Sequence, residues 1–456
     1  MKLSFWEIAQ ATRASNDWTQ WEDLPVTGLE FDSRLIQRGN LFVPLSGTND
    51  GHLFADQAMA NGAVAAFWSS LEEAPEGLRI IEVRDTLEAM QQLAVYYLKK
   101  MNPSVIGITG SNGKTTTKDM TEAVLSQKFP TYKTQGNYNN EIGLPYTILH
   151  MPDDTQKLIL EMGMDHAGEI AFLSKLAQPD VAAITMIGEA HIEHLGSRQG
   201  IAKAKMEIVQ GLKAEGLLLI PNEEPLLKPL LEGLSQTIET FGWEPDADYQ
   251  GRVVRSGKQE TTFAVSVFEE PMAIPLPGSY NVTNALLAAG IGRWFGLSEE
   301  EIRQGLNSLK LTKNRTEWLK AGNGLEILSD VYNANPTAMR LVVDNFRQMP
   351  VTGNRIAVLG DMLELGPDSA QMHQSVGEFL HPDEISEVFL YGAEMSSLYE
   401  EVRPRYGEKA HYYRKNQKRD MIADLKSHLT PQDMVVVKGS NGMGLLEVVT
   451  ALLDER

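Results

Sequence analysis

The chain has 456 residues, of which 42% are apolar and 22% are charged, as in ordinary globular proteins. Its 41 Lys and Arg against 61 Asp and Glu give a formal net charge of −20, which argues against nonspecific binding to nucleic acid or to an anionic membrane. The absence of cysteine excludes disulfides, thiolate metal sites and cysteine nucleophiles, and it fits a reducing cytoplasm. Glu7 stands where a signal peptide needs an apolar core, and no run of about 18 apolar residues occurs, so we expect a cytoplasmic protein outside the membrane.

The pattern of apolar and polar residues divides the chain into three units, residues 1–83, 84–312 and 313–456. In the first unit, short apolar runs alternate with polar turns, and residues 55–66 are predicted to be helical. In the other two units, apolar runs alternate with helical stretches, which indicates α/β sheets with mostly parallel strands. Residues 250–270 alternate Thr, Val and Phe, which predicts an antiparallel flap.

A Gly-rich turn between a β-branched run and a helical stretch has the order of a phosphate-binding loop. Gly110 and Gly113 let the backbone approach a ligand closely. Lys114 supplies a fixed positive charge, and Thr115 offers a hydroxyl to Mg²⁺. The match is incomplete, because an isoleucine stands five positions before Gly113 where a glycine is expected, and the alternative is a Gly-rich turn with an incidental Lys. The predicted nucleotide-binding loop comprises Thr109, Gly110, Ser111, Asn112, Gly113, Lys114, Thr115 and Thr116.

Polar side chains also follow other apolar runs of the second unit, among them Glu161 and His191. Because the carboxyl ends of parallel strands meet at one edge of a sheet, we expect both to face the same crevice as Lys114. Glu161 there would hold Mg²⁺, or it would merely end a strand. His191 lies nearer its strand end than His194 does, so His191 is the preferred ligand, and His194 is left to solvent or packing.

Lys205 falls on the apolar stripe that runs through Ile201 and Ile208, whereas Lys203 falls on the opposite face of the same predicted helix. A lysine on a buried face should have a lowered pKa. Its neutral amine can react with CO₂ to give a carbamate, which offers oxygen ligands to a metal. The alternative is a lysine that extends its ammonium to solvent.

Two pairs of asparagines accompany these groups. Asn281 and Asn284 begin a predicted helix, where they either cap it or pair with the edge of an adenine. Asn333 and Asn335 follow a strand that ends at Asp330, where these polar residues either complete a site across a cleft or form a turn. In the first unit, Ser33 and Arg34 either read a phosphate or sugar or make a surface ion pair.

In chain order, these residues resemble the Mur ligases of peptidoglycan synthesis, a family that also has a shortened phosphate loop. The resemblance rests on Thr109-Gly-Ser-Asn-Gly-Lys-Thr115, Glu161, His191, Ala-Lys-Ala-Lys205, Asn281 with Asn284, Arg315 and Asp330. Within the family the chain is most similar to members that join D-alanyl-D-alanine to UDP-N-acetylmuramoyl-tripeptide. The runs that carry this similarity are Phe31-Asp-Ser-Arg34, Thr134-Gln-Gly-Asn-Tyr-Asn-Asn-Glu-Ile-Gly143, Tyr332-Asn-Ala-Asn-Pro336, Gly360-Asp-Met-Leu-Glu-Leu-Gly366 and Lys438-Gly-Ser440.

The resemblance implies a cytoplasmic monomer in which residues 1–83 bind the UDP-muropeptide, residues 84–312 bind ATP, and residues 313–456 form a Rossmann-like domain for nucleotide and dipeptide. It implies two Mg²⁺ ions, one on Thr115 and Glu161, the other on or near His191 and a carbamylated Lys205. It implies catalytic roles for Lys114, Glu161, His191 and Lys205. The remaining residues are implied around the nucleotide (Asn281, Asn284, Arg315, Asp330), on the muropeptide side (Ser33, Arg34, Thr134, Asn137, Asn140) and near the incoming dipeptide (Asn333, Asn335).

The implied reaction makes a peptide bond from a carboxylate, which needs a better leaving group than hydroxide. The tripeptide carboxylate would attack the γ-phosphate of ATP to give an acyl phosphate and ADP, and the dipeptide amine would then displace phosphate. Metal ions, Lys114 and the loop amides would neutralise the crowded oxygens, and positioning would supply much of the rest.

Other functions are weighed against this one. The nearest is a sister ligase that adds a single amino acid to the UDP-N-acetylmuramoyl-dipeptide, but its Asp-Asn-Pro-Arg signature is replaced here by Asn333-Ala-Asn-Pro336. Folylpolyglutamate synthase has its nucleotide loop early, whereas about a hundred residues precede the loop here. From another class, a phosphate-loop kinase would not need the first and third units. A nucleotide-gated binding module would not need Glu161, His191 and Lys205 together.

Overall fold

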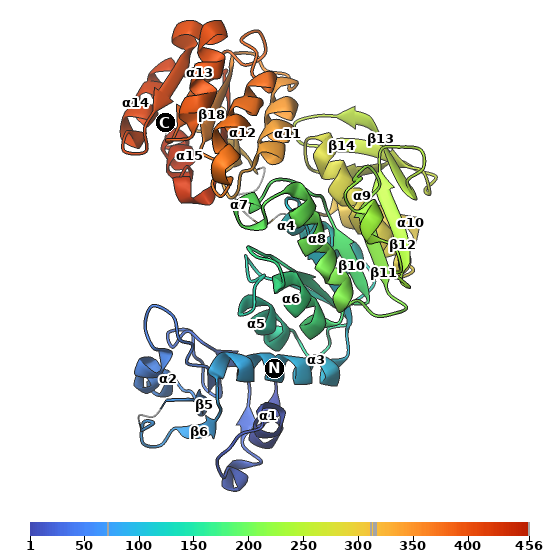
Figure 1. Ribbon diagram of the computed structural model, residues 1–456, viewed down its shortest axis with the longest axis vertical. Helices are drawn as coiled ribbons and strands as arrows, with labels where there is room; N and C mark the ends of the chain where they lie inside the picture. The colour runs from blue at the N-terminus through green and yellow to red at the C-terminus, as the bar shows by residue number, and fades with distance from the viewer. Residues whose placement is uncertain (71–72, 311, 313–316, 455–456) are drawn as a thin grey trace.

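The computed structural model describes residues 1–70, 73–310, 312 and 317–454. Its larger sheets follow one another along the chain, and Figure 1 shows them as three successive bodies from blue to red. We call each sheet with its surrounding helices the N-terminal, central and C-terminal unit. Arg315, expected near the nucleotide, and the expected start of the third unit at residue 313 lie outside the described residues.

The N-terminal unit is built on a four-stranded parallel sheet in the order β3-β4-β5-β6. Its elements are β1 (Leu3–Ser4), α1 (Phe5–Thr12), β2 (Pro25–Val26), β3 (Leu29–Glu30), β4 (Leu41–Phe42), α2 (Ala55–Ala60), β5 (Ala65–Trp68) and β6 (Arg79–Glu82). The prediction of one helix over residues 55–66 is wrong at its C-terminal end, because Ala65 and Ala66 belong to β5. Both are wholly buried between neighbouring strands, where a continuous apolar run favours a strand.

Helix α3 (Thr86–Met101) joins the N-terminal unit to the central one and lies between them in Figure 1. It begins at a side-chain cap, in which Asp85 accepts a hydrogen bond of 2.8 Å from the backbone N–H of Glu88. One buried apolar cluster contains Ile81 of β6, Leu93 of α3 and Ile148 of α5 (Gly143–His150). The two units therefore share a core through α3.

The central sheet has nine strands in the order β15-β14-β13-β12-β11-β10-β7-β9-β8. Its strands are β7 (Ser104–Thr109), β8 (Thr131–Lys133), β9 (Lys157–Glu161), β10 (Val181–Ile184), β11 (Leu217–Pro221), β12 (Thr237–Gly242), β13 (Tyr249–Ser256), β14 (Thr261–Val265) and β15 (Met272–Ile274). Strands β7 to β13 pair in parallel, whereas β13, β14 and β15 pair antiparallel, which confirms the predicted flap.

Helices cover both faces of the parallel part, so its strands are apolar on both sides. The helices are α4 (Lys114–Leu125), α5 (Gly143–His150), α6 (Glu169–Ala177), α7 (Ile192–Leu195), α8 (Arg198–Met206), α9 (Ser279–Trp294) and α10 (Glu299–Asn307). Ile106 of β7 belongs to the same buried cluster as Val124 of α4 and Leu286 of α9. Its neighbour Val105 belongs to the other cluster, with Ile170 of α6 and Ile201 of α8. Among the helices of the described residues, none is both long and apolar enough to cross a bilayer.

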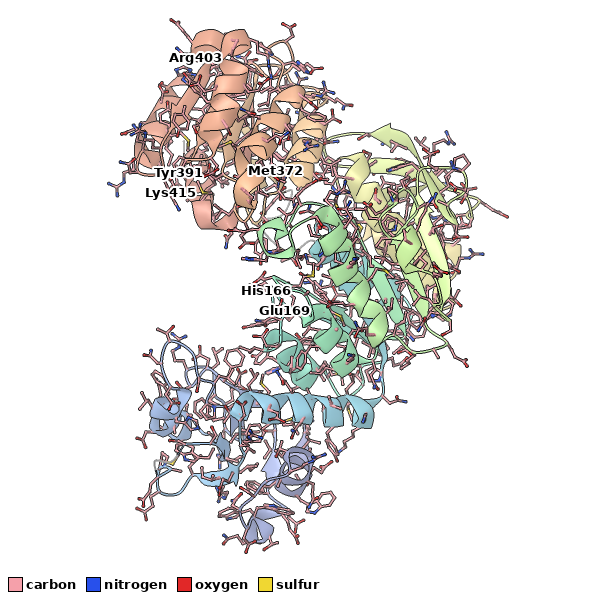
Figure 2. The ribbon with its side chains drawn as sticks, in the orientation of Figure 1. His166, Glu169, Met372, Tyr391, Arg403 and Lys415 are labelled. Carbon is pink, nitrogen blue, oxygen red and sulfur yellow. The ribbon has the colours of Figure 1, made fainter. Side chains whose placement is uncertain are left out.

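The C-terminal unit contains a six-stranded sheet in the order β16-β17-β21-β18-β19-β20, which is parallel except for β16. Its elements are β16 (Glu317–Lys320), β17 (Glu326–Asp330), α11 (Pro336–Arg347), β18 (Arg355–Gly360), α12 (Ser369–Gln374), β19 (Glu387–Tyr391), α13 (Met395–Tyr406), β20 (Ala410–Tyr413), α14 (Lys418–His428), β21 (Met434–Lys438) and α15 (Leu446–Leu453). The alternation of strands and helices confirms the predicted α/β class. After β19, the Tyr391 hydroxyl donates to the carbonyl of Lys415 at 2.6 Å, and Figure 2 shows these residues side by side.

A buried histidine holds the loop after β18. The Nε2 atom of His373 accepts the backbone N–H of Met362 at 3.0 Å, and its Nδ1 donates to the Ser369 carbonyl at 2.8 Å. Burial lowers the pKa of His373, against the opposing effects of the Ser369 hydrogen bond and the Asp361 and Glu394 charges. The folded protein therefore keeps this ring neutral, with Nε2 as the acceptor.

We expect His373 to make the protein less stable in mild acid. Its folded pKa lies below the unfolded value of about 6.5, so the unfolded chain gains the proton first as the pH falls. The stabilisation is complete above the unfolded pKa and is lost as the pH falls through the folded pKa. The His373→Gln variant should be less stable near neutrality but should lose less free energy of unfolding between about pH 7.5 and pH 5.5. Urea unfolding at both pH values measures this, with exposed His381→Gln as control, and equal losses in both variants would contradict it.

Candidate functional site

The turn between β7 and α4 has the backbone of a phosphate loop. Gly110 and Gly113 have φ values of +150° and +82°. A Cβ atom on Gly110 would lie 1.8 Å from the Thr185 hydroxyl oxygen, and one on Gly113 would lie 2.5 Å from the Asn284 amide oxygen. No side chain caps α4, so the backbone N–H groups of its first turn are left for an anion to bind. Lys114 folds back over the turn and donates to the Gly110 carbonyl at 2.7 Å.

The segment after β10 supports this turn. Strand β10 ends at Ile184, and the residues beyond it bond to the loop. The backbone N–H of Ser111 donates to the Met186 carbonyl at 3.0 Å, and the Ser111 hydroxyl accepts the N–H of Gly188 at 2.9 Å. The Thr185 hydroxyl donates to the Asn112 carbonyl.

Glu161 ends β9 next to the phosphate loop and is 1% exposed. Its Oε2 atom accepts the Thr115 hydroxyl at 3.0 Å and lies 3.4 Å from the ammonium of Lys118. Its Oε1 atom accepts the side-chain amide of Asn139 at 3.0 Å, and its backbone N–H donates to the Thr134 hydroxyl at 3.0 Å. A carboxylate buried beside a hydroxyl is a hard-oxygen donor set that suits Mg²⁺.

Lys118 and Asn139 were missed by the sequence analysis. Lys118 is wholly buried and lies on α4 one turn beyond Thr115, so the i, i+3 spacing of the two polar residues was the available signal. Thr134, expected on the muropeptide side, is itself wholly buried, and its hydroxyl holds the backbone of Glu161.

A polar cavity of about 300 Å³ opens beside the loop. It is lined by Lys114, Thr115, Glu161 and His191, which confirms that these four residues face one crevice. The central unit supplies further lining residues, and the C-terminal unit contributes Tyr332, Asn333, Leu363, Glu364, Ser440, Asn441 and Gly442.

A second cavity, of about 290 Å³, lies on the other side of the loop, and we call it the apolar cavity. Met186, Trp243 and Leu341 give it apolar walls, while Asn281 and Asn284 supply amides. Neither asparagine caps α9, since Gly278 is the N-cap residue. Asn281 donates to the Pro277 carbonyl at 2.7 Å, and Asn284 accepts the Thr117 hydroxyl at 3.2 Å. The residues that line both cavities are Asn112, Gly113 and Asn333.

His191 has a left-handed backbone with φ of 61° and lies where the central and C-terminal units meet. Its Nδ1 atom is 2.6 Å from Oε2 of Glu364 and 3.2 Å from Oδ1 of Asp165. Burial lowers the pKa of His191, and the charge of Glu364 opposes this effect. Neither carboxylate was singled out from the sequence. His194 is exposed and stacks on His166 at 4.7 Å between ring centroids, and Figure 2 labels His166 near Glu169 at the start of α6.

Lys205 is buried, as its position on the apolar stripe of α8 predicted, and Lys203 is exposed. Burial lowers the pKa of Lys205 well below its usual value, and the charge of Lys114 lowers it further. Lys205 does not line the polar cavity. The lowered pKa favours the neutral amine, which is the form that can react with CO₂.

The C-terminal unit supplies two further contacts to the site. Asn335 caps α11 by accepting the N–H of Ala338 at 2.9 Å, and it also accepts the amide of Asn112 in the phosphate loop at 3.1 Å. Asp330 forms an ion pair of 2.5 Å with Lys438, whose ammonium is buried and also donates to the Asn333 carbonyl. Lys438 was quoted in a motif but was given no role from the sequence.

Six of the seven expected substrate residues line neither cavity, and Thr134 and Asn335 among them have been described above. Ser33 donates to Gln57 at 2.8 Å, and exposed Arg34 pairs with Asp32 at 2.7 Å. Asn137 is exposed, and Asn140 accepts the backbone N–H of Gly143 at 2.9 Å.

The geometry defines a class of protein. A phosphate loop, a buried carboxylate beside a threonine hydroxyl and two cavities shared with a second α/β unit form a site for a nucleoside triphosphate and a second ligand.

Comparisons with known proteins agree with this class. Three family models match the chain: the Mur ligase family, catalytic domain over residues 25–97, the Mur ligase middle domain over 108–292, and the Mur ligase, glutamate ligase domain over 314–441. The UDP-N-acetylmuramoyl-tripeptide–D-alanyl-D-alanine ligase of Bacillus subtilis (strain 168) is 41% identical over 100% of this chain and 99% of its own length. The ligase of the same name from Escherichia coli (strain K12) is 33% identical over 98% of both chains.

Solved structures give the same result. A crystal structure of MurF from Acinetobacter baumannii covers 100% of this chain and 99% of its own, with a TM-score of 0.89 at 29% identity. The MurF ligase of Thermotoga maritima in complex with ADP covers 94% of this chain and 98% of its own, with a TM-score of 0.81 at 27% identity. The chain belongs to the Mur ligase family.

We expect Lys118→Met to destabilise the protein by about 3–5 kcal/mol, because it leaves the buried Glu161 carboxylate without its ammonium. Urea unfolding measures the change, and exposed Lys175→Met on α6 serves as the control. A Lys118→Met protein within about 0.5 kcal/mol of wild type would show that the ion pair does not hold Glu161 in place.

Proposed function

We propose that this chain is an ATP-dependent ligase that joins D-alanyl-D-alanine to the tripeptide of UDP-N-acetylmuramoyl-tripeptide in peptidoglycan precursor synthesis. The observation that carries the proposal is the polar cavity, in which Lys114, Thr115 and Glu161 meet residues of the C-terminal unit. Relatives of that name match the whole chain, which favours this acceptor and dipeptide over those of the sister ligase. Neither of these relatives is a kinase or a binding module.

ATP is proposed to bind across the phosphate loop. Its adenosine fits the apolar cavity beside Trp243, Asn281 and Asn284, and its phosphates fit the α4 N-terminus and Lys114. The MurF ligase of Thermotoga maritima binds ADP, which supports this assignment. Asp330 also lines the apolar cavity, and Arg315 is kept from the family resemblance alone.

Two Mg²⁺ ions are proposed to accompany the nucleotide. Thr115 and Glu161 would hold one through hard oxygen atoms, and His191 with a carbamylated Lys205 would hold or adjoin the other. Bound Mg²⁺ would supply positive charge to the phosphate oxygens.

The chain's own residues then explain the chemistry. The polar cavity would hold the tripeptide carboxylate in line with the γ-phosphorus, and this positioning replaces a bimolecular encounter. The carboxylate oxygen forms a bond to phosphorus while the bond from phosphorus to the β-γ bridging oxygen breaks, which gives an acyl phosphate and ADP. Lys114 and the loop amides stabilise the negative charge of the transferred group. The dipeptide amine then attacks the acyl carbon, loses a proton and expels phosphate.

The UDP-muropeptide and the dipeptide are assigned to different units of the chain. Residues 1–83, with Ser33 and Arg34, would bind the UDP-muropeptide together with Thr134, Asn137 and Asn140, while residues 84–312 bind ATP. Residues 313–456, with Asn333 and Asn335, would bind the incoming dipeptide and part of the nucleotide. We propose a monomer that works in the cytoplasm, where ATP and the nucleotide-linked precursors are available.

Oxygen transfer tests this function. Tripeptide precursor labelled with ¹⁸O in its terminal carboxylate should give one labelled oxygen in each phosphate released, measured by mass spectrometry, and only when D-alanyl-D-alanine is present. Lys114→Ala should lower ligation by at least about 10³-fold, because it removes the fixed cation from the transferred phosphoryl group, while leaving the unfolding curve unchanged. Phosphate without label, or near-normal ligation by Lys114→Ala, would refute the acyl-phosphate assignment.

Carbamylation of Lys205 has its own test. Enzyme equilibrated with ¹³C-bicarbonate at about pH 8 should show one carbamate carbon by NMR, because burial lowers the pKa of this amine and so favours its reactive neutral form. Lys205→Arg introduces a permanent positive charge and cannot form the carbamate, so it should lack the signal and most of the activity. Lys203→Arg on the exposed face of α8 is the control. A signal that persists in Lys205→Arg would place the carbamate elsewhere.

A further inference from the structure

Two histidines and two carboxylates gather in the C-terminal unit, outside both cavities. Glu387 is the first residue of β19, His411 lies on the neighbouring strand β20, and His428 is the last residue of α14. Asp424 lies one turn before His428 on the same helix. Figure 1 shows α14 on the outer side of the C-terminal unit, away from α11 and the central unit.

Three of these side chains point their ligand atoms at one place. Oε2 of Glu387 is 2.8 Å from Nδ1 of His428 and 3.4 Å from Nε2 of His411, and all three atoms lie within 4.8 Å of one another. Tetrahedral zinc with bonds of about 2.0–2.1 Å keeps its ligand atoms about 3.3 Å apart. The two distances from Oε2 of Glu387 lie close to this value, so small side-chain movements would allow the three atoms to bind one metal ion.

The opposite sides of both rings face a second carboxylate. Nδ1 of His411 is 3.6 Å and Nε2 of His428 is 3.7 Å from the carboxylate of Asp424, which also accepts the Tyr413 hydroxyl. Metal-bound histidines usually turn their other nitrogen to a carboxylate, which fixes the tautomer and raises the basicity of the ligand. Asp424 occupies the position of this carboxylate for both histidines.

One atom of the cluster makes no hydrogen bond to the described residues. Nε2 of His411 is buried and, among the described residues, makes no hydrogen bond, although it points toward Glu387. A buried nitrogen without a partner costs free energy. The ring cannot easily turn away, because it stacks on Phe389 at 4.3 Å between centroids and meets His428 edge-on at 5.0 Å. A metal ion at this point would supply the missing partner.

We propose that Glu387, His411 and His428 form a binding site for a borderline transition-metal ion, Zn²⁺ or Co²⁺, with Asp424 behind the two rings. Two imidazoles and one carboxylate favour these ions over Mg²⁺, which prefers oxygen ligands and keeps several waters. His428 is 34% exposed, so solvent reaches the ion and completes its coordination. The ion ties the end of α14 to the edge strand β20 and to its neighbour β19. This position is outside the two cavities, and the role of the ion is to stabilise this edge of the sheet.

Cobalt provides a direct probe. Co²⁺ added to the full-length enzyme in excess Mg²⁺ should give the intense visible absorption of a four-coordinate ion at one equivalent. The absorption should fall at least 10-fold in His428→Gln, which lies at an exposed helix end and should fold normally, and in Glu387→Gln. It should persist in His381→Gln, an exposed histidine of the same unit. It should also persist in His191→Gln, which tests the other cluster of His and carboxylates, Asp165, His191 and Glu364.

Stability gives an independent readout. Zn²⁺ should raise the melting temperature of the wild type and of His381→Gln but not that of His428→Gln, because binding to the folded state alone stabilises it. Ligation by His428→Gln should match the wild type. Equal Co²⁺ spectra in all variants, loss of the spectrum only in His191→Gln, or no Zn²⁺-dependent shift in the wild type would each overturn the proposal.

Discussion

The close approach of two glycines to their neighbours is the constraint on which the site depends. At Gly110 and Gly113 there is no room for a Cβ atom, because the Thr185 hydroxyl and the Asn284 amide lie against the backbone. Through these contacts the loop packs between the end of β10 and α9. The N-terminus of α4 and the ammonium of Lys114 are therefore held at one edge of the sheet. Asn112 and Gly113 of this loop line both the apolar and the polar cavity.

The C-terminal unit completes the site through a few polar contacts. Asn335 reaches the phosphate loop, Thr337 donates to Glu189 at 2.7 Å, and Glu364 pairs with His191. Such contacts are weak singly, since each exchanges with water. A ligand that fills both cavities would bind the two units together and stabilise their relative position by mass action. Binding and assembly of the site are therefore coupled.

Local charge offsets the acidity of the whole chain. A net charge of −20 repels anionic ligands, yet the residues nearest the loop include several lysines. Lys118 neutralises Glu161, and Lys438 neutralises Asp330, so these carboxylates present oxygen atoms without adding repulsion. Burial lowers the pKa of Lys205, which reduces the positive charge that its side chain contributes. The positive field on a phosphate chain thus comes chiefly from Lys114 and the N-terminus of α4.

Local signals in the sequence were enough to determine the strand–loop–helix order around Lys114, the α/β class and the burial of Lys205, because each depends on residue spacing within a few turns or one strand. The family was also readable from the order of short motifs. Only the tertiary structure decided that Lys118, Asn139 and Thr134 surround Glu161, that Glu364 meets His191, and that Ala65 and Ala66 form a strand. Those contacts join residues far apart in the chain, or depend on a neighbouring strand that supplies the hydrogen bonds. Neither kind of contact can be predicted from a single sequence, because the free energy that selects these contacts arises only when distant segments pack together.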